Sequence, residues 1–220
     1  MSSKPPRKAG KTPSLSAVRI AEIYRTMTDY RREYCDTEDL RFFKMADFWE
    51  WLCGDGGEGW QIKTFRSDLG DDYLRKAAIL TFDGRMTLTV DEGLWGKAKQ
   101  GCKVANFILA HEFAHLALDH HSGNATTKNF MMKQRATDFA MIPPTLEELE
   151  ADYGGVFFQC GPVLEDVRWS AKYIADRSFS DVAKVEKAVR IVRLEGFKRE
   201  VDRQLEAELR RSSSIPRVIL

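Results

Sequence analysis

Residues 103–120 read KVANFILAHEFAHLALDH, and this stretch decides the fold because the rest of the chain must cover it. Its small and apolar residues predict one long helix with a buried side, ended by Ser122 and Gly123. His111 and His115 are four positions apart, so they share one face of that helix. The sequence therefore predicts a helix that presents two imidazoles side by side.

Two imidazoles on successive turns are suited to grip one divalent ion. Zinc is the expected ion, because it binds neutral imidazole nitrogen and its catalytic sites combine three protein ligands with a position for water. Glu112 would lie beside that position. As the general base of a metallopeptidase, it would take a proton from the zinc-bound water as that water attacks a peptide carbonyl. The alternatives are a purely structural metal site, or a half-buried helix whose histidines only form hydrogen bonds; neither needs Glu112.

A third ligand must come from another segment, and Glu148 is the best candidate. Asp152, four residues later, shares its helix face and could accept a hydrogen bond from a ligating histidine. Thr145 and Glu148 also fit a capping box, in which Glu148 would reach back to the helix start instead. Glu147 or Glu150 could replace Glu148, although Glu150 points roughly 160° away from the face of Asp152.

Other side chains near these segments suggest additional roles. Tyr153 is a possible electrophile that would donate to a developing oxyanion, although an aromatic on a helix is more often core. The thiolate of Cys102 could occupy the open zinc position and inhibit the enzyme, although an inert thiol is the default. His120 and His121 fit a helix end near solvent, where positive imidazolium favours the dipole.

The segments before the central helix predict two helices and a small sheet. Residues 75–90 form two apolar, β-branched runs around Asp83-Gly84, a dipeptide suited to a tight hairpin turn. Residues 60–65 would add a third strand. Apolar spacing predicts helices over about 14–34 and 36–52, the second with Asp36, Glu38 and Asp39 in its first turn.

The remaining chain is expected to be mostly helical. Helices are predicted over 93–100, over 129–141 and from Thr145 onward. Gly154 and Gly155 cost stability inside a helix unless another helix comes close, so they predict packing against the helix of residues 103–120. Valines at helical spacing within 182–194, together with Leu194, predict a buried side in the charged C-terminal part.

Composition limits the class of protein. With 220 residues, 43% hydrophobic and 30% charged, the chain suits one globular domain with appendages, and a net charge of +1 excludes global attraction to nucleic acid or membranes. The four cysteines are scattered and no secretory signal is recognisable, so we expect reduced thiols and a cytoplasmic location. No apolar stretch approaches the roughly 20 residues of a membrane helix.

These patterns together predict an α+β fold, a mostly helical metallopeptidase domain around a small antiparallel sheet with N- and C-terminal helical additions. The expected organisation is a disordered basic tail at 1–13, a zincin-like domain at 14–162, a C-terminal helical extension packed on it at 163–211, and a tail at 212–220.

Two segments carry a family resemblance. NFILAHEFAHL at 106–116 resembles the active-site helix of ImmA/IrrE-type metallopeptidases, and ELEADYGG at 148–155 is similar to that family's Glu-x-x-Ala-Asn/Asp segment. The resemblance covers roughly 78–162 and implies a gluzincin-like site that Glu148 completes. It also implies a cytoplasmic peptidase that cleaves a cognate helix-turn-helix repressor in a stress or phage response, sometimes within anti-phage defence operons. The linker 122–144 is long for the family, and FFQCGP at 157–162 replaces its Leu-Met-Pro ending.

Two further interpretations stay open. The HEFAH form and the glycine pair also resemble phage-exclusion peptidases that cut a translation factor. A non-catalytic module, in which zinc only joins two helices and basic surfaces bind DNA or a repressor, is the alternative from another class. The basic residues of 184–211, with the N-terminal tail, make DNA a candidate activating ligand.

Overall fold

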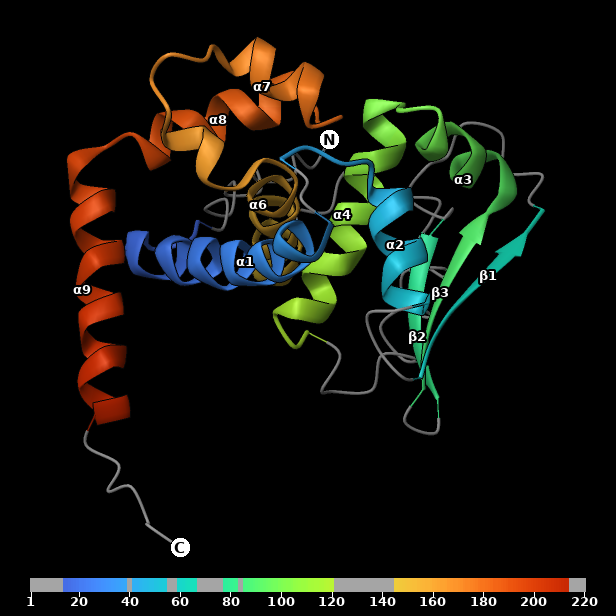
Figure 1. Ribbon diagram of the computed structural model, residues 1–220, viewed down its shortest axis with the longest axis horizontal. Helices are drawn as coiled ribbons and strands as arrows, with labels where there is room; N and C mark the ends of the chain where they lie inside the picture. The colour runs from blue at the N-terminus through green and yellow to red at the C-terminus, as the bar shows by residue number, and fades with distance from the viewer. Residues whose placement is uncertain are drawn as a thin grey trace, which may run out of the picture.

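Helices dominate the protein, and one small sheet lies to the side of them (Figure 1). The computed structural model describes residues 14–38, 41–54, 59–66, 77–82, 85–120 and 145–213. Helices α2 (Met45–Gly54) and α4 (Lys103–Ala117) lie between the sheet and helices α1 (Ala17–Glu38) and α6 (Leu146–Cys160). Helix α9 (Glu195–Ser213) forms the edge farthest from the sheet (Figure 1). The predicted α+β class is confirmed.

The first two helices are α1 (Ala17–Glu38) and α2 (Met45–Gly54). Ser16 caps the start of α1, since its Oγ accepts from the N–H of Arg19 at 3.1 Å. The predicted start of the second helix at Asp36 is wrong, because Asp36 belongs to α1. Helix α2 begins at Met45, whose N–H donates to Asn106 Oδ1 in α4 at 2.7 Å. A distant side chain therefore sets this boundary.

The sheet contains β1 (Trp60–Phe65), β2 (Ala77–Phe82) and β3 (Arg85–Asp91) in the order β1-β3-β2. The predicted hairpin is confirmed: β2 and β3 are antiparallel, with Ile79 opposite Leu88. Its proposed turn at 83–84 lies outside the described residues. The prediction of a purely antiparallel sheet is wrong, because β1 runs parallel to β3. Apolar patterning locates a strand but does not fix which direction a distant strand takes.

The chain continues through α3 (Glu92–Lys99) and α4 (Lys103–Ala117), both starting near their predicted positions. Helix α4 ends at Ala117, before the predicted end at His120, and the proposed stop at Ser122 and Gly123 lies outside the described residues. The predicted helix over 129–141 lies outside the described residues. Helix α6 (Leu146–Cys160) starts where expected, with Thr145 as its N-cap. It is followed by the 3-10 turn η3 (Gly161–Glu165) and the helices α7 (Ala171–Arg177), α8 (Val182–Val192) and α9 (Glu195–Ser213).

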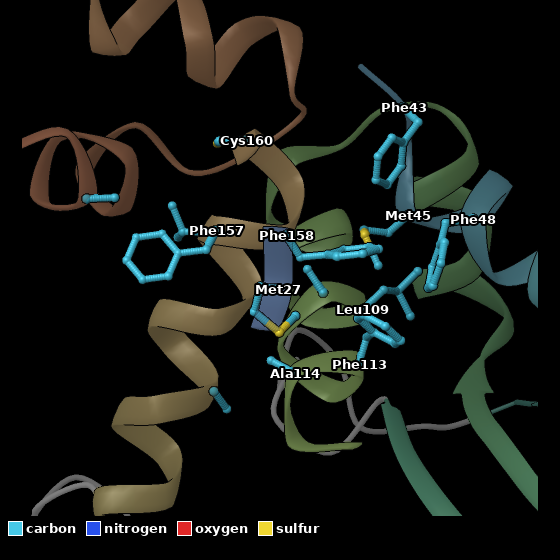
Figure 2. Packing of buried hydrophobic residues seen from close by; sticks show 14 of the residues in the cluster. Met27, Phe43, Met45, Phe48, Leu109, Phe113, Ala114, Phe157, Phe158 and Cys160 are labelled. Carbon is cyan, nitrogen blue, oxygen red and sulfur yellow. The ribbon is translucent and has the colours of Figure 1, made fainter. Parts of the chain in front are cut away.

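Helices α4 and α6 meet in an aromatic core (Figure 2). The rings of Phe113 in α4 and Phe158 in α6 have centroids 4.4 Å apart, and Phe48 of α2 lies 4.7 Å from each. Burial of one such side chain contributes about 1.5–3 kcal/mol. The histidine-bearing face of α4 is turned toward the start of α6, where His111 and His115 contact Glu148.

The glycine pair brings α6 against α4, as predicted. A Cβ added to Gly154 would lie 2.8 Å from the Cβ of Ala114, and one added to Gly155 would lie 3.1 Å from the backbone nitrogen of His111. Side chains at these two positions would therefore push the helices apart. The close approach places the first turns of α6 beside the histidines.

The C-terminal helices share this core. Val185, Val189 and Val192 of α8 are buried as predicted, whereas Leu194 is 59% exposed because it lies in the turn after α8. Helix α9 contacts α1 through Gln204, which donates to the carbonyl of Val18 at 3.2 Å. The proposed tails at 1–13 and 214–220 lie outside the described residues. In the part of the chain that the structure describes, no helix is both long and apolar enough to cross a membrane.

Candidate metal centre

Three donor side chains meet where α4 faces the start of α6. His111 Nε2 lies 3.1 Å from His115 Nε2 and 3.2 Å from Glu148 Oε2, and His115 Nε2 lies 3.5 Å from Glu148 Oε1. An ion with tetrahedral bonds of about 2.0–2.1 Å needs its ligand atoms about 3.3–3.4 Å apart. The three side chains thus lie near tetrahedral separations, with each histidine facing a different oxygen of Glu148, and this cluster could hold a metal ion.

Local structure explains how Glu148 reaches the histidines. The Oγ1 of Thr145 accepts from the backbone N–H of Glu148 at 3.2 Å, so half of the predicted capping box forms. The carboxylate of Glu148 does not need to complete the box and contacts His111 and His115 instead. Both interpretations of Glu148 hold, one for its main chain and one for its side chain.

The electrostatics of the cluster favour positive charge between the donors. Hydrogen bonds with His111 and His115 hold the pKa of Glu148 well below its ordinary value. Burial lowers the pKa of His111, but Asp152 and Glu148 outweigh it and raise that pKa to about 9. Without metal, these carboxylates therefore favour a proton on His111. A divalent cation between the donors would neutralise the same negative charge.

Glu112 lies beside His111 on α4, and burial raises its pKa to about 7. The backbone of Ile79 in β2 donates a hydrogen bond that opposes this effect. A pKa near neutrality suits a general base, although a bound cation would lower it again. Strand β2 is an edge strand of the described sheet, and Ile79 belongs to it. The hydrogen bond therefore shows that this edge of the sheet lies next to Glu112.

Asp152 lies beside His111, as its spacing predicts, but the predicted hydrogen bond between them does not form. Its Oδ1 lies 3.3 Å from the buried Nδ1 of His111, although outside hydrogen-bond geometry. Its other oxygen accepts from Lys184 of α8. Burial raises the pKa of Asp152, but His111 and Lys184 outweigh that effect and lower it. A charged acceptor therefore stands beside the one ring nitrogen of His111 that faces away from the donor cluster.

The chain matches no protein-family model, and no curated protein or solved structure is detectably similar to it. The likeness to ImmA/IrrE-type peptidases thus rests on the motif residues alone.

Sequence reasoning missed a second group of residues, which lies at the Nδ1 side of His115. The Nδ1 atoms of His115 and His120 are 2.9 Å apart, and His120 Nε2 lies 2.9 Å from Glu150 Oε2. The expectation of a solvent-exposed His120 is wrong, since its side chain is 7% exposed. Burial lowers its pKa, which disfavours the imidazolium that dipole capping requires. One sequence feature could have indicated this contact. Glu150 lies on a helix face that fits a metal ligand poorly, so its carboxylate is available to a histidine outside the donor cluster.

The structure does not bring Cys102 to the donors. Cys102 precedes the first turn of α4, and His111 comes nine positions later, which corresponds to about 13 Å along the helix axis. The Tyr153 ring stacks on Phe157, with centroids 5.9 Å apart, and Lys187 Nζ lies 4.6 Å from its centre. These contacts are packing contacts, and an electrophilic role for Tyr153 stays a prediction.

Proposed function

We propose that this protein is a zinc-dependent endopeptidase. One observation carries the proposal: two imidazoles and a carboxylate stand at tetrahedral separations, with Glu112 beside them. Two histidines and a glutamate are a donor set of catalytic zinc sites, which keep a fourth position for water. Structural zinc sites are instead closed by four protein ligands.

The proposed chemistry divides into separate tasks. When bound, zinc supplies Lewis acidity, lowering the pKa of a coordinated water to about 7 and polarising the substrate carbonyl. Glu112 accepts a proton from the attacking water and donates it to the departing amine. His111 and His115 act as neutral ligands, and Asp152 holds the Nδ1 side of His111. No serine or cysteine nucleophile is required.

A protein substrate is supported by the position of β2. An extended peptide can pair its backbone with an edge strand, and β2 pairs only with β3 among the described strands. A peptide bound there would lie next to Glu112, whose carboxylate already accepts from the backbone of Ile79. The family resemblance favours a cognate helix-turn-helix repressor as the substrate. DNA as an activating ligand and a cytoplasmic location stay predictions from the sequence.

The proposal is tested by co-expressing the chain with a candidate helix-turn-helix regulator. Wild type is compared with Glu112→Gln and with Glu206→Gln, a control carboxylate that is 68% exposed on α9. Mass spectrometry of new peptide termini should find regulator fragments with wild type and with the control, and none with Glu112→Gln. Zinc content should be equal in all three. Undiminished cleavage by Glu112→Gln would refute the general-base role, and equal zinc with no fragments from wild type would reject this regulator as substrate.

A further inference from the structure

Helix α4 ends in a turn that folds the chain back onto its own last turn. Asp119 has a φ of 58°, in the left-handed region that Asp tolerates better than most residues. The N–H groups of Asp119 and His120 donate to the carbonyls of Leu116 and His115, both at 2.9 Å. This hydrogen-bond pattern places the residue after the left-handed position against the last turn of the helix. The rings of His120 and His115 are accordingly 5.1 Å apart.

We propose that His120, Glu150 and Arg19 form a hydrogen-bonded chain that positions His115 as a metal ligand. The inference rests on the proposed metal site and assigns a role to three residues outside the donor cluster. We name these residues the His115 support. They are positioning residues, since none of them supplies a ligand atom to the proposed metal site.

The proton positions along the His115 support follow from the distances. His115 Nε2 faces His111 and Glu148, so it is the ligand atom, and Nδ1 must carry the single proton of the neutral ring. That proton points to His120 Nδ1, 2.9 Å away, which must then accept. His120 therefore carries its own proton on Nε2, which donates to Glu150 at 2.9 Å. One assignment satisfies every nitrogen of both rings.

Arg19 completes the support from α1. Its Nε and Nη2 donate to the two oxygens of Glu150 at 2.8 and 2.6 Å, a bidentate pairing that fixes the plane of the carboxylate. Glu150 is only 14% exposed, so this pair is screened less than a surface ion pair. The fixed carboxylate accepts from His120 Nε2, which makes His120 Nδ1 the acceptor for His115.

Zinc titration of the metal-free full chain tests the inference. Losing a residue that supports a ligand typically weakens metal binding by 10–100-fold, so Glu150→Gln should raise the dissociation constant by at least about 10-fold. The matched control is Glu22→Gln, because Glu22 also contacts Arg19, at 3.2 Å, but is 46% exposed. It should bind zinc as wild type does.

Two results would overturn the inference in distinguishable ways. If wild type binds zinc and Glu150→Gln binds it equally well, the His115 support fails while the metal site stands. If wild type does not bind zinc, the proposed function fails and the inference falls with it.

A spectroscopic readout separates positioning from general stability. The chain has four histidines, so nitrogen NMR of the zinc-loaded, histidine-labelled protein can assign each ring. We expect the proton of His115 on Nδ1 and that of His120 on Nε2; a proton on His120 Nδ1 would overturn the proposal. His120→Asn, whose side-chain oxygen can accept in place of Nδ1, should retain more zinc affinity than His120→Leu. Equal loss in these two variants, with unchanged thermal unfolding, would also contradict it.

Discussion

The two histidines of the metal centre are supported differently. His111 lies directly beside a carboxylate, Asp152, whereas His115 reaches Glu150 only through His120. Helix geometry explains the difference: Glu148 and Asp152 share one face of α6, and Glu150 lies roughly 160° around the helix from Asp152. Carboxylates of α6 can reach both histidines only because the imidazole of His120 lies between His115 and Glu150.

The largest expected effect comes from the residue that both sides share. Glu148→Ala should weaken zinc binding by more than the 10–100-fold typical of a supporting residue, because a ligand is lost. Titration calorimetry of the metal-free chain measures this. Glu147→Ala, one residue away and outside the donor cluster, is the control and should bind nearly as wild type does. A weaker effect from Glu148→Ala than from Glu147→Ala would show that the ligand is wrongly assigned.

Asp152→Asn breaks the direct support alone. We expect a 10–100-fold loss of zinc affinity, because the neutral amide removes the negative charge that lies 3.3 Å from Nδ1 of His111. The loss should equal or exceed that of Glu150→Gln, because Glu150 acts on its ligand, His115, only through His120. Competition with a chromophoric chelator measures both variants; a clearly smaller loss for Asp152→Asn would reverse the comparison.

The pH dependence of zinc binding reports on the side of His111. Its ordinary pKa of 6.5 is raised to about 9 in the metal-free protein, where Asp152 and Glu148 outweigh the effect of burial. A ligating imidazole must be neutral, so zinc displaces that proton, and apparent affinity should rise about tenfold per pH unit until the pH nears that pKa. Chelator competition across the pH range measures the slope. A plateau already at the ordinary pKa of His111 would contradict the raised value.

The smallest effect concerns the contact that holds both sides together. Gly154→Ala places a Cβ 2.8 Å from that of Ala114, so α4 and α6 must separate slightly. Overpacking outweighs the helix propensity of Ala, and the free energy of unfolding should fall by about 1–2 kcal/mol. Gly96→Ala in α3 meets nothing within 4 Å and should gain up to about 1 kcal/mol. Urea unfolding compares them; equal gains would show that the contact imposes no constraint.

Local spacing made much of the site predictable. His111 and His115 are one turn apart, and Glu148 and Asp152 repeat that spacing, so their shared faces follow from helix geometry alone. The glycine pair predicted where the two helices meet, because glycine inside a helix costs stability that a close approach of another helix can offset.

The missed features depend on contacts between distant segments. The start of α2 depends on Asn106 of α4, and the parallel direction of β1 depends on the sheet edge that it joins. The His115 support needs the left-handed conformation of Asp119 and a partner, Arg19, that is 131 residues from Glu150. A pattern read along the sequence does not contain these pairings.

X-ray absorption at the zinc edge of the loaded full chain tests the central claim most directly. We predict one zinc per chain with four nitrogen or oxygen ligands at about 2.0–2.1 Å, two of them imidazole, and loss of one ligand in Glu148→Ala. A sulfur ligand at about 2.3 Å, or a spectrum that Glu148→Ala leaves unchanged, would contradict the proposed site.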